Sequence, residues 1–282
     1  MTKNLTVAWV ASVVLSLGFQ APALAGSKVI GTGGATTIEG AAGGGIVPWA
    51  VINGYASSGQ WSITGFGNQV GVDDFSLRTV GAGFSYGNQF EVSFTKQTFD
   101  LDTIGGDLRQ DVIGIKYRVS GELLYTAMPQ ISVGAQWKQH QNFALPQAVG
   151  ALDDQGVDFY VAASKVWLDA VAGRNLLVNA TLRATKANQT GLLGFGSAED
   201  DSYQLMSEVS AALLLTPHLA VGAEFRQKPN QLAFADEEHW RDLFAAWFIN
   251  KNFSVVAGYV DLGSIAGLDQ QQGYYVALEG TW

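Results

Sequence analysis

The sequence predicts an all-β protein, a transmembrane antiparallel up-and-down β-barrel of about twelve strands. Three observations support this fold class. Hydrophobic residues form 48% of the 282-residue chain and charged residues only 15%, yet the hydrophobicity is dispersed over short segments. Many of these segments alternate apolar and polar residues with the two-residue period of a strand. Tight turns also alternate along the chain with long polar connections, as they do in membrane barrels.

The first 25 residues have the pattern of a secretory signal peptide. Lys3 precedes an apolar run from Leu5 to Phe19, and Ala23-Leu24-Ala25 resembles a cleavage site with small residues. The apolar run is short for a transmembrane helix. We therefore expect export through the Sec pathway and a chain divided into a signal peptide at 1–25, a Gly-rich leader at 26–56 and a β-barrel domain at 57–282.

The leader is interrupted by glycines at Gly31, Gly33, Gly34, Gly40, Gly43, Gly44 and Gly45. Glycine at this density lets a backbone turn tightly or approach another backbone closely. Two interpretations stay open. The leader is either plug-like, lying in the lumen or across its mouth, or a flexible segment or irregular first strand. A dinucleotide site is disfavoured, because no helical pattern follows the glycines.

From Trp49 onward the chain consists of strand-length segments. The candidate strands are Trp49 to Ala56, Trp61 to Val70, Phe75 to Tyr86, Phe90 to Phe99, Leu108 to Val119, Gln130 to His140, Val157 to Leu168, Leu176 to Lys186, Tyr203 to Leu215, Leu219 to Lys228, Arg241 to Ile249, Phe253 to Asp261 and Tyr274 to Trp282. The connections at Gly87-Asn88, Thr216-Pro217-His218 and Lys251-Asn252 are tight, whereas 141–156, 187–202 and 229–240 are long and polar.

Strand parity then limits the topology. If the chain ends in the periplasm, the tight turns all face the periplasm, and the first candidate strand would have to run inward from outside. An even-stranded barrel therefore uses the segments from Trp61 to Trp282, with everything earlier in the lumen or at a rim. The alternative is a barrel of about 14 strands in which the leader supplies an additional one.

The last segment alternates most clearly. Tyr274, Val276, Leu278, Gly280 and Trp282 share one face, suited to lipid, and Glu279 lies on the other. An alternating strand that ends on an aromatic is similar to the C-terminal strand of bacterial outer-membrane barrels, so we expect these five residues to form the assembly signal. Aromatic residues near other segment ends predict interfacial girdles, namely Trp61, Phe84, Tyr86, Phe90, Tyr117, Trp167 and Phe253. The segments 241–249 and 253–260 are apolar on both faces, which predicts packing against the leader or a subunit contact.

Charged residues on the inward faces are the candidate lumen lining. They are Glu91, Lys116, Arg118, Lys138, Lys165, Arg183, Glu208, Glu224, Arg226 and Lys228. Charges in a narrow lumen are costly unless they are hydrated or paired. They form either a selectivity lining for a small polar or anionic solute or an ion-paired network that fills and stiffens the barrel.

Other chemistries have little support. The acidic runs Asp153-Asp154, 199–201 and 236–238 are typical of solvated loop tips, and none has the spacing of a calcium loop, so no metal site is expected. The three histidines lie in no nucleophile motif, which predicts a protein that is not an enzyme and carries no cofactor. A formal net charge of −9 argues against nucleic-acid binding.

The mature chain resembles an uncharacterised family of predicted proteobacterial outer-membrane β-barrel proteins, a domain of unknown function. The resemblance rests on Gly40 to Ala50, Gly156 to Tyr160, Ala172 to Leu177, Ala180 to Asn188 running into Gly191 to Gly196, and Tyr259 to Gly263. It covers nearly all of residues 26–282. The resemblance implies the outer membrane and a barrel fold, and it implies no substrate.

The expected function is that of an outer-membrane barrel in a Gram-negative bacterium, a narrow or plugged channel for small polar solutes. The alternative is a non-conducting structural or adhesive barrel that acts through its acidic outer loops. The expected partners are outer-membrane lipid and lipopolysaccharide, the barrel-assembly machinery and a small polar solute. The pattern leaves the oligomeric state open.

Overall fold

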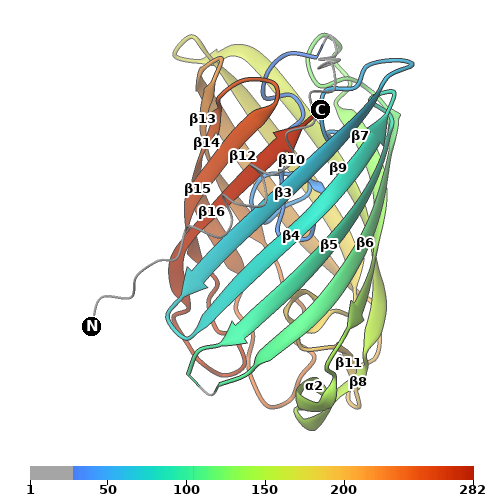
Figure 1. Ribbon diagram of the computed structural model, residues 1–282, viewed down its shortest axis with the longest axis vertical. Coiled ribbons are helices and arrows are strands. Elements are labelled where there is room, and N and C mark those ends of the chain that lie inside the picture. Colours follow the sequence, from blue (N-terminus) through green and yellow to red (C-terminus); the bar gives the residue numbers. More distant parts are fainter. Residues whose placement is uncertain (1–27, 104) are drawn as a thin grey trace.

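The computed structural model describes residues 28–103 and 105–282, and the predicted signal peptide lies outside these residues. Its main body is a closed antiparallel barrel of twelve strands (Figure 1). In chain order these are β3 (Trp61–Val72), β4 (Phe75–Tyr86), β5 (Phe90–Leu101), β6 (Asp107–Ser120), β7 (Gln130–His140), β9 (Gln155–Val171), β10 (Arg174–Thr185), β12 (Gln204–Thr216), β13 (Leu219–Arg226), β14 (Trp240–Phe248), β15 (Phe253–Asp261) and β16 (Gln272–Thr281). The predicted fold class and the favoured strand number are confirmed.

Short elements lie outside the barrel sheet. They are β1 (Ala35–Thr36), β2 (Ala42–Gly43), α2 (Ala144–Ala148), β8 (Ala151–Asp153), the 3₁₀ turn η1 (Asn188–Gly191) and β11 (Phe195–Ser197). β1 pairs with β2, and β8 pairs with β11. In the described residues no helix is long and apolar enough to cross a bilayer.

Trp49 to Ala56, an alternating candidate strand, does not join the barrel sheet. These residues are buried at every position, so neither alternating face meets solvent or lipid. Their backbone polar groups bond to side chains of the barrel wall, as the contacts of Ala50 illustrate below. This segment is therefore part of the barrel interior and not a strand of the barrel wall. The alternative of fourteen strands is wrong.

The barrel closes between its first and last strands. β16 pairs with β3 from Gly273 opposite Val72 to Thr281 opposite Thr64. Trp282 extends this seam, because its N–H donates to the Ile63 carbonyl at 2.8 Å and its carbonyl accepts from the Ile63 N–H at 2.8 Å. Every strand of the barrel thus has two neighbours, and the sheet has no free edge.

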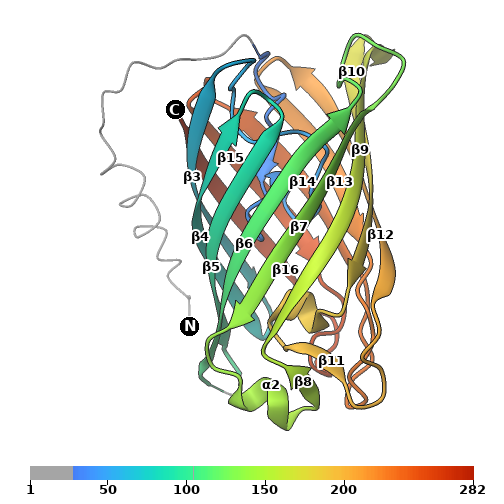
Figure 2. The same ribbon diagram turned by 90° about the vertical axis from the view of Figure 1, so that its right-hand side faces the viewer.

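The two ends of the barrel differ. We call the end that holds Trp61 and Trp282 the short-turn end, because most of its connections are tight (top of Figure 1). The opposite long-loop end carries the connections 141–154, 186–203, 227–239 and 262–271, together with α2, β8 and β11 (bottom of Figure 2). The asymmetry holds with exceptions, since β3 to β4 is a short turn at the long-loop end and residues 121–129 form a longer connection at the short-turn end.

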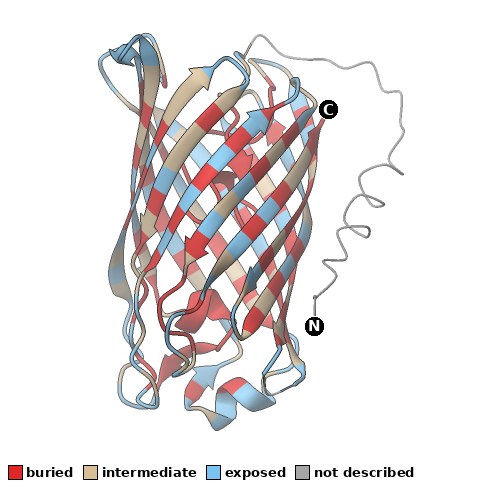
Figure 3. Ribbon diagram, turned by 90° about the vertical axis from the view of Figure 1, so that its left-hand side faces the viewer, coloured by how far each residue is buried: buried red, intermediate tan, exposed pale blue. Residues whose placement is uncertain are grey.

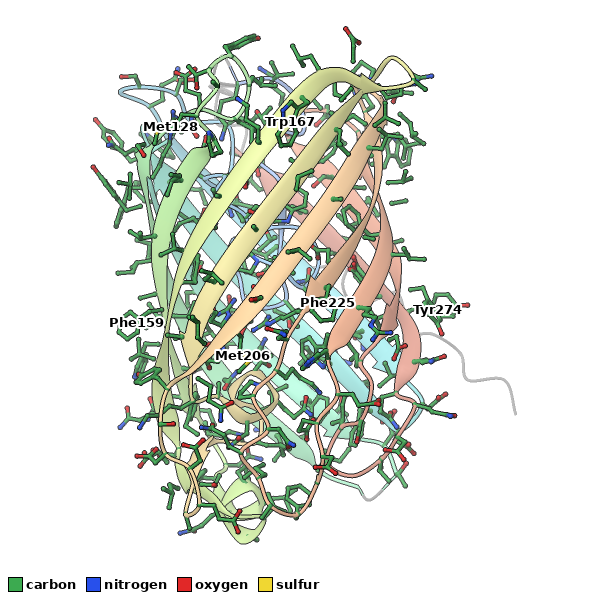
Figure 4. The ribbon with its side chains drawn as sticks, turned by 180° about the vertical axis from the view of Figure 1, so that it is seen from behind. Met128, Phe159, Trp167, Met206, Phe225 and Tyr274 are labelled. Atoms are coloured by element: carbon green, nitrogen blue, oxygen red, sulfur yellow. The ribbon has the colours of Figure 1, made fainter. Side chains whose placement is uncertain are left out.

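The outer wall of the barrel is apolar. Burial alternates along nearly every strand, so one set of side chains faces out and the other faces the lumen (Figure 3). Exposed aromatics gather near both ends: Trp61, Tyr86, Tyr117, Trp167 and Trp247 at the short-turn end, and Phe159, Tyr203, Tyr259 and Tyr274 towards the long-loop end. Phe159 and Tyr274 point away from the barrel in Figure 4. Aliphatic residues such as Ile115, Val133 and Val209 lie between, which is the pattern that a bilayer requires.

An apolar layer crosses the lumen near the long-loop end. It consists of Ile38, Val70, Leu77, Phe99, Leu108, Leu192, Trp240, Leu262 and Ile265. A second apolar region lies on the inner faces of β14 and β15, where Phe244 lies 6.5 Å from Trp49 between ring centroids. The double-sided hydrophobicity of these strands therefore comes from packing against the leader.

Candidate functional site

Most of the described part of the leader occupies the barrel lumen. Residues 33–56 are buried without interruption, and we call this segment the plug. It enters at the short-turn end, reaches its tip at Ile38 to Gly40, turns through Gly43 to Gly45 and returns to Ser57 before β3 begins. It is visible as the blue segment inside the barrel in Figure 1. A barrel of twelve strands is wider than one that its own side chains fill, and the plug takes up that space.

The glycines of the plug allow close approach to the wall. A Cβ placed on Gly44 would lie 2.1 Å from Glu224 Oε1, and one on Gly45 would lie 2.3 Å from Tyr275 Oη. Gly40 has φ +90° and leaves no space for a Cβ against Thr95. The Gly-rich composition therefore reflects backbone packed directly on side chains of the barrel.

Glu224 of β13 accepts hydrogen bonds from a run of plug amides. The N–H groups of Gly45, Ile46 and Val47 donate to its Oε2 at 2.8, 2.8 and 3.3 Å. The indole N–H of Trp49 donates to Oε1 at 3.1 Å. A wall carboxylate thus satisfies the turn of the plug, whose amides would otherwise be buried without partners.

Glu91 and Lys116, opposite each other on β5 and β6, bind both arms of the plug. Glu91 accepts from the N–H of Ala42 at 3.0 Å and of Asn53 at 2.7 Å. Lys116 Nζ donates to the carbonyls of Ala42 at 2.8 Å and Val51 at 3.0 Å. The two side chains also lie 3.4 Å apart as an ion pair.

The returning arm of the plug is bonded to β9, β7 and β10. The Ala50 N–H donates to Ser164 Oγ at 2.8 Å, and the Ala50 carbonyl accepts from Ser132 Oγ at 2.6 Å. The Pro48 carbonyl accepts from Thr181 Oγ1 at 2.8 Å. These contacts are polar and come from side chains, in place of the backbone pairing that a strand of the sheet would make.

The tip of the plug carries one carboxylate, Glu39, into a group of three wall cations. Its Oε1 contacts Lys138 Nζ, and its Oε2 lies 2.7 Å from Arg226 Nη1 and 3.6 Å from Arg183 Nη2. The cations come from β7, β13 and β10 respectively. Although burial disfavours the charged form, Arg226, Lys138 and Arg183 hold the pKa of Glu39 well below its ordinary value.

Two wall carboxylates complete this central charge cluster. Asp158 Oδ2 lies 2.7 Å from Lys138 Nζ and 3.3 Å from Arg183 Nη1. Glu208 Oε1 lies 2.6 Å from Arg183 Nε and 3.4 Å from Arg226 Nε. All members of the cluster are almost completely buried, so it is a fully desolvated network whose charges depend on one another.

The long-loop end contributes a second closure. η1 folds into the lumen, where Gln189 and Thr190 both have positive φ, at 47° and 61°. Lys138 Nζ donates to the Thr190 carbonyl at 2.9 Å, and Lys228 Nζ donates to Gln189 Oε1 at 3.2 Å. A β-branched residue in the left-handed region is strained, and these two ammonium groups hold η1 in place.

Lys228 also joins the other long loops. It pairs with Glu237 at 2.9 Å and donates to the Ser264 carbonyl at 3.0 Å. Burial lowers the pKa of Lys228 and raises the pKa of Glu237, so each ion is stabilised in its charged form only by its neighbours. The loops are therefore drawn together over the barrel mouth.

The ten predicted lumen residues divide into several groups. The central cluster contains four of them, Lys138, Arg183, Glu208 and Arg226, and a separate ion pair contains Glu91 and Lys116. Glu224 binds plug amides, and Lys228 joins the long loops. At the short-turn end, Lys165 donates to the carbonyls of Glu122, Leu124 and Thr126, and the partly exposed Arg118 donates to the carbonyl of Gly121. All except Arg118 are buried. Their role as a conducting lining stays a prediction.

Three buried carboxyl groups lie outside the predicted lumen lining. Glu39 is the one acidic residue in the leader, and Asp158 and Asp242 lie on inward faces of β9 and β14. Asp158 has the same strand parity as Tyr160 and Ser164, which could have placed it in the lumen. Within the described residues, no group of three His, Cys, Asp or Glu side chains is arranged to hold a metal ion.

A strip of polar side chains on β3, β4 and β5 faces the plug without bonding to it. The hydroxyls of Ser62, Ser85, Ser93 and Thr79, and both polar atoms of the Asn68 amide, are buried and have no hydrogen-bond partner in the described part of the chain. Buried hydroxyls and amides are normally satisfied. This strip is the part of the lumen wall best suited to ordered water.

Solved structures with a similar fold include outer-membrane porins. The NanC porin is 13% identical, with 78% of this chain and 98% of that chain covered and a TM-score of 0.47. The outer membrane protein Omp33 of Acinetobacter baumannii is 13% identical, with 79% and 98% covered and a TM-score of 0.45. The KdgM porin is 9% identical, with 78% and 99% covered and a TM-score of 0.47.

Sequence comparison gives one family. No curated protein matches the sequence. A family model described as "Protein of unknown function (DUF3034)" matches residues 32–279. The match spans the plug and all of the barrel except the end of β16, and it confirms the resemblance to an uncharacterised family that the sequence motifs indicate.

Proposed function

We propose that this chain, which belongs to the family of proteins of unknown function (DUF3034), is a plugged channel of a Gram-negative outer membrane. The plug closes the barrel at rest, and small polar solutes pass when the plug moves. The apolar outer wall with an aromatic girdle at each end supports the membrane location. By the usual asymmetry of such barrels, the short-turn end faces the periplasm and the long-loop end faces outward.

One observation carries the proposal: outside the apolar contact with β14 and β15, the plug is held to the wall by polar side chains. The plug is held by wall carboxylates, ammonium groups and hydroxyls, including Glu91, Lys116 and Glu224. Buried ion pairs are a poor way to stabilise a permanent core, because apolar packing of the same volume is often as good or better. Water can replace these contacts when the plug leaves, and the wall left behind would be hydrophilic except on the inner faces of β14 and β15 and at the apolar layer.

The direction of plug movement follows from its course. Both arms run to the short-turn end, so the plug forms a hairpin-like insertion from that side. At its tip, Ile38 belongs to the apolar layer, and this layer together with η1 closes the other end. Opening therefore requires the plug to shift towards the short-turn end and the outer closure to loosen. Hydrophobic constrictions of this kind gate by excluding water.

Planar-bilayer recording of the refolded full chain tests the proposal. Wild-type protein should show rare, brief openings, and Glu39→Ala, which removes the bonds at the plug tip, should open far more often. Lys96→Ala is the control, because Lys96 is largely exposed and pairs with Asp111 outside the lumen. The absence of current from the wild type and both variants, or a wild-type channel that is open continuously, would contradict the proposal.

A non-conducting barrel that acts through its acidic outer loops is the second candidate. Closure of the lumen from both ends favours it. However, Glu237 is already paired with Lys228 and Asp201 with Lys186, so part of the acidic surface is engaged within the protein. Two results together would favour this candidate over the channel. They are the absence of current, and the loss of binding to a partner of the outer loops when Asp153 and Asp154 are both replaced by Asn.

A further inference from the structure

The central charge cluster is balanced only when the plug is present. Its wall members are three cations, Lys138, Arg183 and Arg226, and two carboxylates, Asp158 and Glu208. The wall alone therefore carries one excess positive charge in a desolvated site. Glu39 of the plug supplies the missing negative charge.

The cations depend on Glu39 to different degrees. Arg183 has partners on the wall that do not depend on the plug: its Nε lies 2.6 Å from Glu208 Oε1, and its Nη1 donates to Gln136 Oε1 at 2.7 Å. Arg226 Nη1, in contrast, has both of its bonds to plug atoms, Glu39 Oε2 at 2.7 Å and the Ile46 carbonyl at 3.0 Å. Lys138 loses one of its two carboxylate partners. Departure of the plug would therefore free Arg226 Nη1 and one side of the Lys138 ammonium.

We propose that Lys138 and Arg226 form a binding site for the carboxylate of a small anionic solute, and that Glu39 occupies this site as a tethered mimic of that solute. In the plugged state Glu39 binds with one oxygen on each cation, Oε1 on Lys138 and Oε2 on Arg226. A free carboxylate can adopt the same bridge. The transport role of the site rests on the proposed function, whereas binding does not.

The charge of the cluster selects the class of ligand. A monocarboxylate restores neutrality, as Glu39 does. A dianion such as hydrogen phosphate (HPO₄²⁻) would leave an uncompensated negative charge next to Asp158 and Glu208, which is costly in a desolvated site. A neutral amide has the shape of a carboxylate but leaves the excess positive charge unbalanced. The site should therefore prefer a monocarboxylate over both.

Chemical rescue tests the site without measuring current. Glu39→Ala in the full chain removes the carboxylate and leaves a methyl group, so that acetate can fill the space of the missing atoms. Amide hydrogen exchange at Ala42, Gly45 and Ile46 reports how firmly the plug is held, because these N–H groups donate to Glu91 and Glu224. Sodium acetate should slow their exchange at least about tenfold, and acetamide, or sodium chloride at equal ionic strength, should not.

Glu279→Ala is the matched control. Glu279 is also a carboxylate at the plug interface, but it bonds to the hydroxyls of Thr36 and Thr281 and has no ion pair among residues 28–103 and 105–282. Acetate should not slow the exchange of the plug amides in Glu279→Ala. Equal effects of acetate and acetamide on Glu39→Ala, or equal rescue of both variants by acetate, would overturn the proposal.

Two further measurements keep the outcome decisive. If Glu39→Ala does not refold, Glu39→Ser is used, because its short side chain also leaves the space of the carboxylate open. This variant should bind labelled acetate, and Arg226→Gln in the same chain should abolish that binding. Inorganic phosphate should compete with acetate at least about tenfold less well than formate does. Retention of acetate binding without Arg226 would refute the site. Acetate rescue without any channel current would retain the site and refute the channel.

Discussion

Gly44 shows how one residue of the plug is fixed by the wall. A methyl group at this position would meet Glu224 Oε1 at 2.1 Å, so the side chain or the plug must move. We expect Gly44→Ala to destabilise the docked plug by about 1–3 kcal/mol, the usual cost of overpacking. Hydrogen exchange of the Gly45 and Ile46 amides measures the effect.

The control for this variant is Gly65→Ala. Gly65 lies in β3, has open space where a Cβ would stand and shows no positive φ. Its substitution should change stability by no more than about 0.5 kcal/mol. Similar loss of plug protection in both variants would show that Gly44 is not held by contact with Glu224.

The ion pairs of Glu39 determine how the docked plug responds to low pH. Its pKa in the folded state is lowered well below 4.5 by Arg226, Lys138 and Arg183, which outweigh its burial. A lowered carboxyl pKa stabilises the folded state above the unfolded pKa, and this contribution is lost only as the pH falls through the folded value. The contribution of Glu39 to protection of the plug amides should therefore be unchanged between about pH 7 and about pH 5. It is measured as the ratio of exchange rates between Glu39→Ala and the wild type, corrected for intrinsic rates. A fall in this ratio at about pH 6 would contradict this assignment.

At this scale, alternation predicted most of the buried charges but not their partners. The predicted lining holds seven basic and three acidic residues, and this excess of base required additional carboxylates. Glu39 and Asp158 supply them. Asp158 could have been found from strand parity, whereas the position of Glu39 follows from the three-dimensional course of the plug, which local pattern does not encode.

The polar strip on β3, β4 and β5 predicts where water enters the barrel. Ser93 of β5 and Ser132 of β7 are both buried, but only the hydroxyl of Ser132 has a partner in the described chain, the Ala50 carbonyl at 2.6 Å. If the strip on β3 to β5 is hydrated, Ser93→Cys should react with a small neutral thiol reagent at least about tenfold faster than Ser132→Cys. The natural chain has no cysteine, so the background is nil. Equal rates would exclude a hydrated strip.

The seam between β16 and β3 makes a prediction about assembly. Trp282 forms two backbone hydrogen bonds with Ile63, and its ring meets Phe253 edge-on at 5.8 Å. Deleting Trp282 should lower the yield of heat-modifiable barrel in the membrane much more than Trp247→Ala, which removes an exposed aromatic of the same girdle. The predicted assembly signal would be rejected if the two variants assembled equally well.

The strands were the most predictable elements. Phe75–Tyr86, Gln130–His140 and Phe253–Asp261 have the bounds that alternation predicts. The strand number also followed, because parity is set by which ends the tight turns occupy. The long loops were less predictable. η1 is held in the lumen by contacts with Lys138 and Lys228, and such distant contacts leave no periodic signal.

The whole molecule is a barrel closed by its own leader. The sequence left the leader between a plug and an extra strand, and burial of residues 33–56 supports the first of these. The physical reason is volume, since twelve strands enclose more space than their inward side chains fill. The same lumen would be largely polar if the plug moved, so the proposed function depends on the mobility of the plug.

Locking the plug tests this claim most directly. Ala50→Cys together with Ser164→Cys places one thiol on the plug and one on β9, where the Ala50 N–H lies 2.8 Å from Ser164 Oγ. A short reducible crosslinker joins them, and Ala50→Cys alone controls for modification. Currents are recorded in planar bilayers, with urea below the concentration that unfolds the barrel, so that the plug is loosened. We expect channel openings from the reduced double variant and no openings after crosslinking. The openings should return when the crosslinker is reduced. Openings that persist with the plug crosslinked to the wall would contradict the account.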